Sequence, residues 1–155
     1  MSTAQQTQAD AGHELLITRS FDAPRHLVFA AWSSAEHQMH WMGLKDFTVP
    51  SCEVDFRPGG SYRTCVRSPE GQEVVMSGTY REIVEPSRLV FTFAFEEQGE
   101  RGAESLVTLD FIEVGGKTRL VFRQAPFRTV EDRDGHHNGW TQCLDRLDVY
   151  LLKAA

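Results

Sequence analysis

The chain has 155 residues, enough for one domain to bury a core without disulfides or a structural metal. Its 22 acidic and 16 basic residues give a net charge of -6, and the basic residues are scattered, so the sequence argues against a nucleic-acid-binding surface. No apolar run is long enough to span a bilayer, and residues 1–12 lack the charged-then-apolar layout of a secretory signal. We therefore expect a cytoplasmic protein that does not attach to membranes.

The first third of the chain predicts one strand and two short helices. Residues 1–12 are polar without an apolar period and are predicted to be a mobile tail, so the single domain should span residues 13–155. HELLITRSF, residues 13–21, alternates apolar and polar side chains, which is typical of a strand. Asp22 and Pro24 predict a helix from about residue 24 to 32. Ser33 and Glu36 form a capping box for a second short helix through residue 40.

From Val49 onward the sequence changes to a strand-like pattern. Six segments are rich in Val, Phe, Tyr and Thr: CEVDF, SYRTCVR, EVVMSGTYREI, RLVFTFAFE, SLVTLDFIEV and KTRLVFRQ. Short turns separate them, such as Gly115-Gly116, and such short connections permit only antiparallel neighbours. The one long connection, EEQGERGAES, is polar and predicted to be a mobile loop.

After Pro126 the period becomes helical again. Thr129 with Asp132 predicts the start of a long helix, and four side chains recur along one face of it: Trp140, Leu144, Leu147 and Leu151. Gly135 and Gly139 share another side, where we expect another backbone to come close.

Together these elements predict an α+β protein in which a curved, seven-stranded antiparallel sheet surrounds the C-terminal helix. Alternation along the strands predicts three inward-facing sets, which are Phe91, Phe93 and Phe95, then Val107, Leu109 and Phe111, and then Leu120, Phe122 and Gln124. Ten Phe and three Trp either fill the space between sheet and helix or leave a cavity in it. Trp41 and Met42, in a short apolar linker, are placed to act as a lid over such a cavity.

Several segments in combination resemble a known bacterial family. They are RSFDAPRHLVFAAW (19–32), HWMG (40–43), CEVDFRPGGSYR (52–63), GTYREIVEPSRLVF (78–91) and GWTQCLDRL (139–147). The family is named after the C-terminal domain of the heat-shock-protein-90 ATPase activator and belongs to the START-like, or SRPBCC, superfamily. The resemblance implies a helix-grip fold with a pocket between the curved sheet and the long helix. The chain departs from the pattern at HWMG, where Trp-Trp-Gly is common, so we expect a narrower aromatic lid and carry over no ligand preference from the family.

The leading functional prediction is binding of a small hydrophobic or aromatic molecule, lipid-like or polyketide-like, with no cofactor. The candidate binding residues are Trp41, Met42, Tyr62, Thr64, Tyr80, Phe91, Phe93, Phe122, Gln124, Trp140 and Leu144. Alternatives are a cyclase or hydrolase of the same fold, or a chaperone-associated interaction module suggested by the family's name. A homodimer is a further possible arrangement.

Metal binding and nucleophilic catalysis are the weaker chemical interpretations. His136 and His137 could join Asp134 and either His37 or His40 at a metal, but no metal-binding motif supports this, and exposed helix residues are the simpler interpretation. The three cysteines, Cys52, Cys65 and Cys143, are widely spaced and odd in number, which favours reduced, buried thiols over disulfides or zinc. We expect Cys143 to be inert, because no neighbouring residue would lower its pKa.

Overall fold

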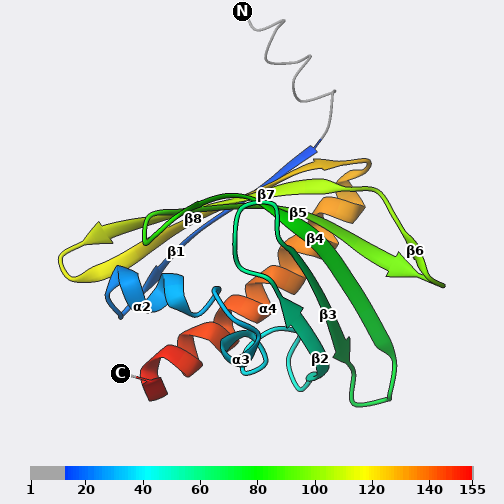
Figure 1. The fold of residues 1–155 in the computed structure, drawn as a ribbon, viewed down its shortest axis with the longest axis horizontal. Coiled ribbons are helices and arrows are strands. Elements are labelled where there is room, and N and C mark those ends of the chain that lie inside the picture. The colour runs from blue at the N-terminus through cyan, green and yellow to red at the C-terminus, as the bar shows by residue number, and fades with distance from the viewer. Residues whose placement is uncertain (1–12, 155) are drawn as a thin grey trace, which may run out of the picture.

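The computed structural model describes residues 13–154, so the predicted tail, residues 1–12, lies outside the described residues. The α+β helix-grip architecture is confirmed: a curved antiparallel sheet surrounds one long helix (Figure 1). In chain order the elements are β1 (His13–Phe21), α2 (Arg25–Ala30), α3 (Ala35–Gln38), β2 (Thr48–Val54), β3 (Ser61–Arg67), β4 (Glu73–Val84), β5 (Arg88–Glu97), β6 (Glu100–Arg101), β7 (Ser105–Val114), β8 (Lys117–Phe127) and α4 (Val130–Ala154). None of the helices between residues 13 and 154 has the length and hydropathy needed to cross a bilayer.

The strands follow the order β1-β8-β7-β5-β4-β3-β2, with every neighbouring pair antiparallel and the short β6 paired to β5. The predicted Gly115-Gly116 turn joins β7 to β8, and both glycines have positive φ, 58° and 80°. Two consecutive positive φ values match the tight turn that suits the twist of a hairpin, which explains why glycine occupies both positions.

Alternation along the central strands produces the predicted inward face. In β7 the buried side chains include Val107, Leu109 and Phe111, and in β8 they include Leu120, Phe122 and Gln124. In β5 Phe91 and Phe93 are buried, and Phe95, near the strand end, is partly buried. The concave side of the sheet therefore carries a continuous apolar surface that a helix must cover.

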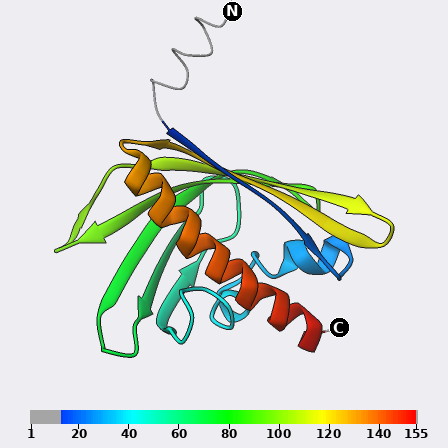
Figure 2. The ribbon, with the colours of Figure 1, turned by 180° about the vertical axis from the view of Figure 1, so that it is seen from behind.

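Helix α4 covers that surface and runs diagonally across the sheet (Figure 2). Its predicted apolar stripe is buried from Trp140 to Leu151. The predicted start is also confirmed, because the Thr129 hydroxyl accepts a hydrogen bond from the Asp132 amide at 3.0 Å. On the outer side of the helix, Arg19 of β1 pairs with Asp145 at 2.6 Å.

The two short helices begin at different residues from those predicted. Pro24 precedes α2 without any side-chain cap, and Asp22 instead lies 3.7 Å from the Lys117 amine. The cap of α3 is Ser34, whose hydroxyl accepts from the His37 amide at 3.2 Å, whereas the Ser33 hydroxyl donates to a carbonyl of the preceding turn. The predicted capping box at Ser33 is therefore wrong by one residue, because the chain becomes extended only at Ser34.

The connection predicted to be a mobile loop, residues 96–105, instead contains β6. Arg101 reaches across β5 to β4, where its guanidinium donates to the Ser77 hydroxyl at 2.9 Å and to the Ser77 carbonyl at 2.8 Å. The polar composition of this segment thus reflects bonding to the central strands β4 and β5, which composition alone does not distinguish from a free loop.

Candidate ligand-binding site

An open cleft of about 400 Å³ lies between the first half of α4 and the strands β3, β4 and β5. The short connection from Met42 to Phe47 closes one side of it. Its lining is largely apolar and includes Met42, Phe47, Val66, Val74, Met76, Phe93, Phe95 and Trp140. We call this space the cleft.

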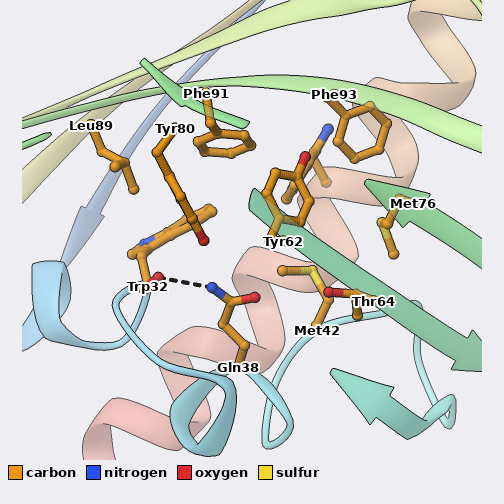
Figure 3. A pocket seen from close by; sticks show the side chains of 11 residues that line it. Trp32, Gln38, Met42, Tyr62, Thr64, Met76, Tyr80, Leu89, Phe91 and Phe93 are labelled. Carbon is orange, nitrogen blue, oxygen red and sulfur yellow. Dashed lines mark hydrogen bonds between the residues drawn. The ribbon is translucent and has the colours of Figure 1, made fainter. Parts of the chain in front are cut away.

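A second, much smaller space lies deeper between sheet and helix, with a volume of about 20 Å³ (Figure 3). We call it the inner chamber. Its wall is formed by Trp32, Gln38, Met42, Tyr62, Thr64, Met76, Tyr80, Leu89, Phe91, Phe93 and Trp140. Four of these side chains, Met42, Met76, Phe93 and Trp140, also line the cleft, so the two spaces share a common wall.

Local backbone geometry brings β3, β4 and β5 together beside the chamber. Gly78 of β4 lies so close to β5 that a Cβ atom there would stand 1.8 Å from the Thr92 carbonyl oxygen. The same oxygen accepts a hydrogen bond from the Tyr62 hydroxyl at 2.7 Å. Glycine is needed at 78 because the chain approaches closely, and this approach positions the Tyr62 ring in the chamber wall.

The polar groups of the chamber wall are neutral. Burial raises the pKa of Tyr62 well above its ordinary value, and burial also raises the pKa of Tyr80, against a smaller opposite effect of the Gln38 amide. Both phenols therefore keep their protons at pH 7. Gln38 donates to the Trp32 carbonyl at 2.8 Å, and the Thr64 hydroxyl lies 3.5 Å from the Cys52 sulfur.

The indole nitrogens of the three tryptophans differ in their bonding. Trp41 Nε1 donates to the Ala31 carbonyl at 3.1 Å, and Trp140 Nε1 donates to the Gln124 side chain at 2.8 Å. Trp32 Nε1 is buried and has no hydrogen-bond partner among the described residues. Trp32 forms part of the chamber wall, but this nitrogen has almost no accessible surface and therefore does not face the open space.

The structure brings seven of the eleven candidate residues to the wall of the inner chamber, and four lie elsewhere. The seven are Met42, Tyr62, Thr64, Tyr80, Phe91, Phe93 and Trp140. Those outside the wall are Trp41, Phe122, Gln124 and Leu144, all of them buried in the surrounding core. Sequence reasoning missed Trp32, Gln38, Met76 and Leu89, of which the aromatic Trp32 at the end of a predicted helix was the detectable signal.

Trp41 does not occupy the position of a lid. Its side chain is fully buried, packs edge-to-face on Trp32 with ring centroids 4.7 Å apart, and bonds to a backbone carbonyl. Met42, the next residue, is the one that faces both spaces. The expected lid position is thus wrong for Trp41, because the chain turns its side chain into the core, and Met42 alone of the pair lies beside the two spaces.

Gln124 connects buried groups within the protein. Its side-chain oxygen accepts from Trp140 Nε1 at 2.8 Å, and its nitrogen donates to the Ser105 hydroxyl at 2.8 Å. A side chain with both ends bonded in this way orients Trp140 and Ser105, so we assign Gln124 a positioning role behind the wall.

The histidines occupy different environments. His137 is exposed, as predicted, but the ring of His136 is partly buried against Phe93, Phe95 and Phe127, with centroid distances of 5.9, 5.2 and 4.7 Å. His37 instead meets Tyr150, 2.7 Å from its hydroxyl. Within residues 13–154 no three His, Cys, Asp or Glu side chains converge as a metal site would require.

Four hydrogen bonds hold the 42–47 connection against α4. Arg146 donates to the carbonyls of Met42 and Leu44, both at 2.9 Å, and the Lys45 amide donates to the Gln142 side chain at 3.0 Å. The Cys143 thiol lies 3.3 Å from the Gly43 carbonyl, and burial raises its pKa to about 11. Such a thiol is protonated at pH 7, which agrees with the prediction of an inert cysteine.

The other two cysteines are also unpaired thiols. Cys65 is buried as predicted, whereas Cys52 is only partly buried, so the expectation of full burial is wrong for Cys52. The neighbourhood of Gly135 and Gly139 also differs from the expectation. No backbone approaches either glycine, because both line the open cleft.

Comparison with known proteins agrees with this architecture. The family model described as activator of Hsp90 ATPase homolog 1-like protein matches residues 22–152. The chain is similar to the crystallised AHSA1 protein of Silicibacter pomeroyi, with 27% identity, a TM-score of 0.84, and coverage of 92% of this chain and 99% of that chain. No curated protein sequence matches significantly.

Other solved structures are similar over the same length. A putative uncharacterised protein from Rhizobium leguminosarum has 28% identity, a TM-score of 0.79, and coverage of 90% of this chain and 94% of that chain. A protein from Nitrosomonas europaea has 26% identity, a TM-score of 0.76, and coverage of 91% and 94%. Because the family model matches most of the chain, the protein belongs to the family of activator of Hsp90 ATPase homolog 1-like proteins.

Proposed function

We propose that the protein binds a small hydrophobic or aromatic molecule in the cleft between α4 and the curved sheet. The observation that carries the proposal is the cleft itself, about 400 Å³ in volume and lined mainly by apolar side chains. Pockets for small molecules are typically apolar clefts of roughly 300–1,000 Å³ with few polar groups. The inner chamber is too small to hold such a molecule, so the cleft would take its body.

Two features of the lining suit an apolar guest. Met42 and Met76 form part of the common wall, and unbranched methionine side chains adapt to different shapes. Trp140 and Phe93 provide aromatic surface in the same wall, with ring centroids 5.7 Å apart. Burying apolar ligand surface there would contribute about 25 cal/mol per Å², less the cost of association.

The glycines of α4 allow a direct test. Gly135 lines the cleft, and nothing lies within 4 Å of a Cβ atom added there, so Gly135→Leu adds a bulky side chain at the cleft from a position whose Cβ meets open space. We expect this variant to fold and to lose binding of hydrophobic probes, measured by tryptophan fluorescence titration and by native mass spectrometry. Gly135→Ala, which adds one methyl group, is the matched control and should keep binding. Equal binding by both variants would contradict the cleft as the site.

The enzyme alternative stays a prediction, because the cleft lining contains Glu131 and Asp132, and His136 Nδ1 lies 3.5 Å from an Asp132 carboxylate oxygen. The chamber wall itself offers no base. The ionisable side chains there are Tyr62 and Tyr80, and burial raises the pKa of both, so neither can act as a base at pH 7. The chaperone-associated module and the homodimer stay predictions. A pull-down with the purified chaperone and a measurement of solution mass would test them separately.

A further inference from the structure

His136 borders two open spaces of the molecule. One is the cleft, and the other, which we call the outer groove, has a volume of about 600 Å³ and is bounded by residues 100–105 and the end of β8. Four residues line both spaces, and they are Phe93, Phe95, Asp132 and His136. The side chain of His136 is 13% exposed, so most of its ring is packed and the remainder is accessible at these shared walls.

One ring nitrogen of His136 bonds within α4. Its Nδ1 lies 2.8 Å from the Asp132 carbonyl oxygen, and because a carbonyl can only accept, Nδ1 carries a proton and donates it. The Asp132 carboxylate also lies on the Nδ1 side of the ring, 3.5 Å from that nitrogen. In the neutral imidazole the other nitrogen, Nε2, is therefore the acceptor.

Nε2 of His136 is both unpartnered and accessible. It makes no hydrogen bond to any residue that the structure describes. It is not sealed in the interior either, because Trp32 Nε1 is the one fully buried side-chain nitrogen or oxygen without a partner between residues 13 and 154. The rings of Phe93, Phe95 and Phe127 hold the imidazole in place. His136 thus offers a fixed polar atom in largely apolar surroundings, which is the kind of group that orients a ligand.

The charges around the imidazole disfavour an anionic ligand. The cleft lining contains no Lys or Arg, and its carboxylates are those of Glu131 and Asp132. The guanidinium of Arg101 in the outer groove is already 2.9 Å from a Glu104 oxygen. Besides Asp132 and His136, the titratable residues of the outer groove are Glu97, Glu100, Glu104, Arg101, Arg128 and His13. Carboxylates therefore outnumber guanidinium groups beside both spaces, and a ligand carboxylate would be repelled.

We infer that Nε2 of His136 binds a hydroxyl group of the ligand, so that the ligand is an apolar alcohol or phenol whose body lies in the cleft. A hydroxyl is neutral, and because it both donates and accepts, it can bond Nε2 whether or not the imidazole is protonated. A ketone or ether oxygen can only accept, so it has no partner in the neutral imidazole. This inference rests on the proposed function and specifies its ligand class.

Three matched probes test the inference by equilibrium dialysis: 2-naphthol, 2-methylnaphthalene and 2-naphthoate. The first two have nearly the same shape, and 2-naphthoate adds a negative charge and should bind most weakly. In His136→Phe the ratio of the affinities for 2-naphthol and 2-methylnaphthalene should fall roughly three- to tenfold, because the ring remains but Nε2 is lost. Comparing ratios cancels the different hydrophobicity of the two probes. His137→Phe, at the exposed neighbouring position, is the matched control and should keep the wild-type ratio.

Long-range proton–nitrogen correlation NMR of the histidine rings gives an independent readout in the wild-type protein. The signals of His136 are assigned by their loss in His136→Phe. Binding of 2-naphthol should shift the His136 Nε2 resonance, and 2-methylnaphthalene should shift it far less. An unchanged affinity ratio in His136→Phe, an equal Nε2 shift with both neutral probes, or tightest binding by 2-naphthoate would overturn the inference while leaving the proposed function intact. Failure of all three probes to bind would instead overturn the proposed function.

Discussion

Gln124 shows how much a single buried amide can organise. It bonds Trp140 of α4 and Ser105 of β7 from its position in β8, so three elements meet at one side chain. Because its oxygen and nitrogen are both used, the wall residue Trp140 has a fixed orientation. The inward direction of Gln124 followed from alternation, but its role did not, since alternation does not reveal which neighbour a polar group meets.

Replacing Gln124 by leucine should destabilise the protein by about 1–3 kcal/mol, because Trp140 Nε1 would lose its buried partner. Urea unfolding at pH 7 measures this change. Arg123→Gln, at the neighbouring exposed position of β8, is the control and should change stability by less than about 0.5 kcal/mol. A stable Gln124→Leu protein would show that the Trp140 donor finds another acceptor.

Cys143 makes stability depend on pH in the alkaline range. Its folded-state pKa of about 11 exceeds the ordinary value of 9.0, so the unfolded chain loses this proton first as pH rises. Stability is therefore fully present below pH 9 and falls between pH 9 and 11, by about 1 kcal/mol at pH 10 from this thiol alone. Unfolding measured at pH 7 and pH 10 should show a smaller loss for Cys143→Ala than for the wild type. An identical loss would mean that the buried tyrosines account for the whole effect.

Strand period determines which side chains of the candidate site face inward. Tyr62, Tyr80 and Phe93 reach the chamber from three different strands, as their inward positions implied. Phe122 and Leu144 also face inward but lie behind the wall, fully buried, because the curvature of the sheet decides which inward residues contact each other first. Sequence period contains no information on that curvature.

At the scale of elements, β4 and β5 depend on one glycine. Gly78→Ala would place a Cβ atom 1.8 Å from the Thr92 carbonyl oxygen, which is backbone and cannot move aside cheaply. We expect a loss of about 3 kcal/mol or more in unfolding free energy. In contrast, Gly135→Ala should raise stability by about 0.5–1 kcal/mol, because it meets open space and improves the helix. Thermal and urea unfolding of Gly78→Ala and Gly135→Ala measure these changes. If both variants were more stable than the wild type, the close approach at Gly78 would be contradicted.

Long elements were easier to predict than short ones. Helix α4 has a buried stripe over several turns, and its start at Thr129 was correct. The short helices α2 and α3 contain too few turns to establish a period, so their predicted bounds rested on capping signals. At Ser33 and Ser34 two candidate caps are adjacent, and only the backbone conformation distinguishes them.

For the whole molecule, the order of elements and short turns sufficed to predict an antiparallel sheet around a helix. What the sequence left open was whether the interior is full. The interior is only partly filled: the inner chamber is almost closed, whereas the cleft beside α4 is open. Packing at that level depends on distances between elements, which hydrophobic pattern does not determine.

Arg146 connects the helix to the side of the cleft that holds Met42. Arg146→Met keeps an apolar stem but loses both donations to the carbonyls, so stability should fall by about 1 kcal/mol and hydrophobic probes should associate faster. Stopped-flow tryptophan fluorescence measures the association rate, and Arg133→Met, on the first turns of the same helix, serves as the control. An unchanged rate would show that loosening the 42–47 connection does not make entry of a probe easier.

Hydrogen bonds with Arg146, Gln142 and Cys143 hold the 42–47 connection and α4 together, and they form one side of the cleft. The opposite side of the cleft is the β3–β4 hairpin. Val66 and Val74 lie beside its turn, and only β2 lies beyond it in the sheet (Figure 1). We therefore expect a bulky guest to be accommodated by bending of this hairpin. The stiffness of two strands, rather than any movement of the helix, then sets the largest molecule that the protein admits.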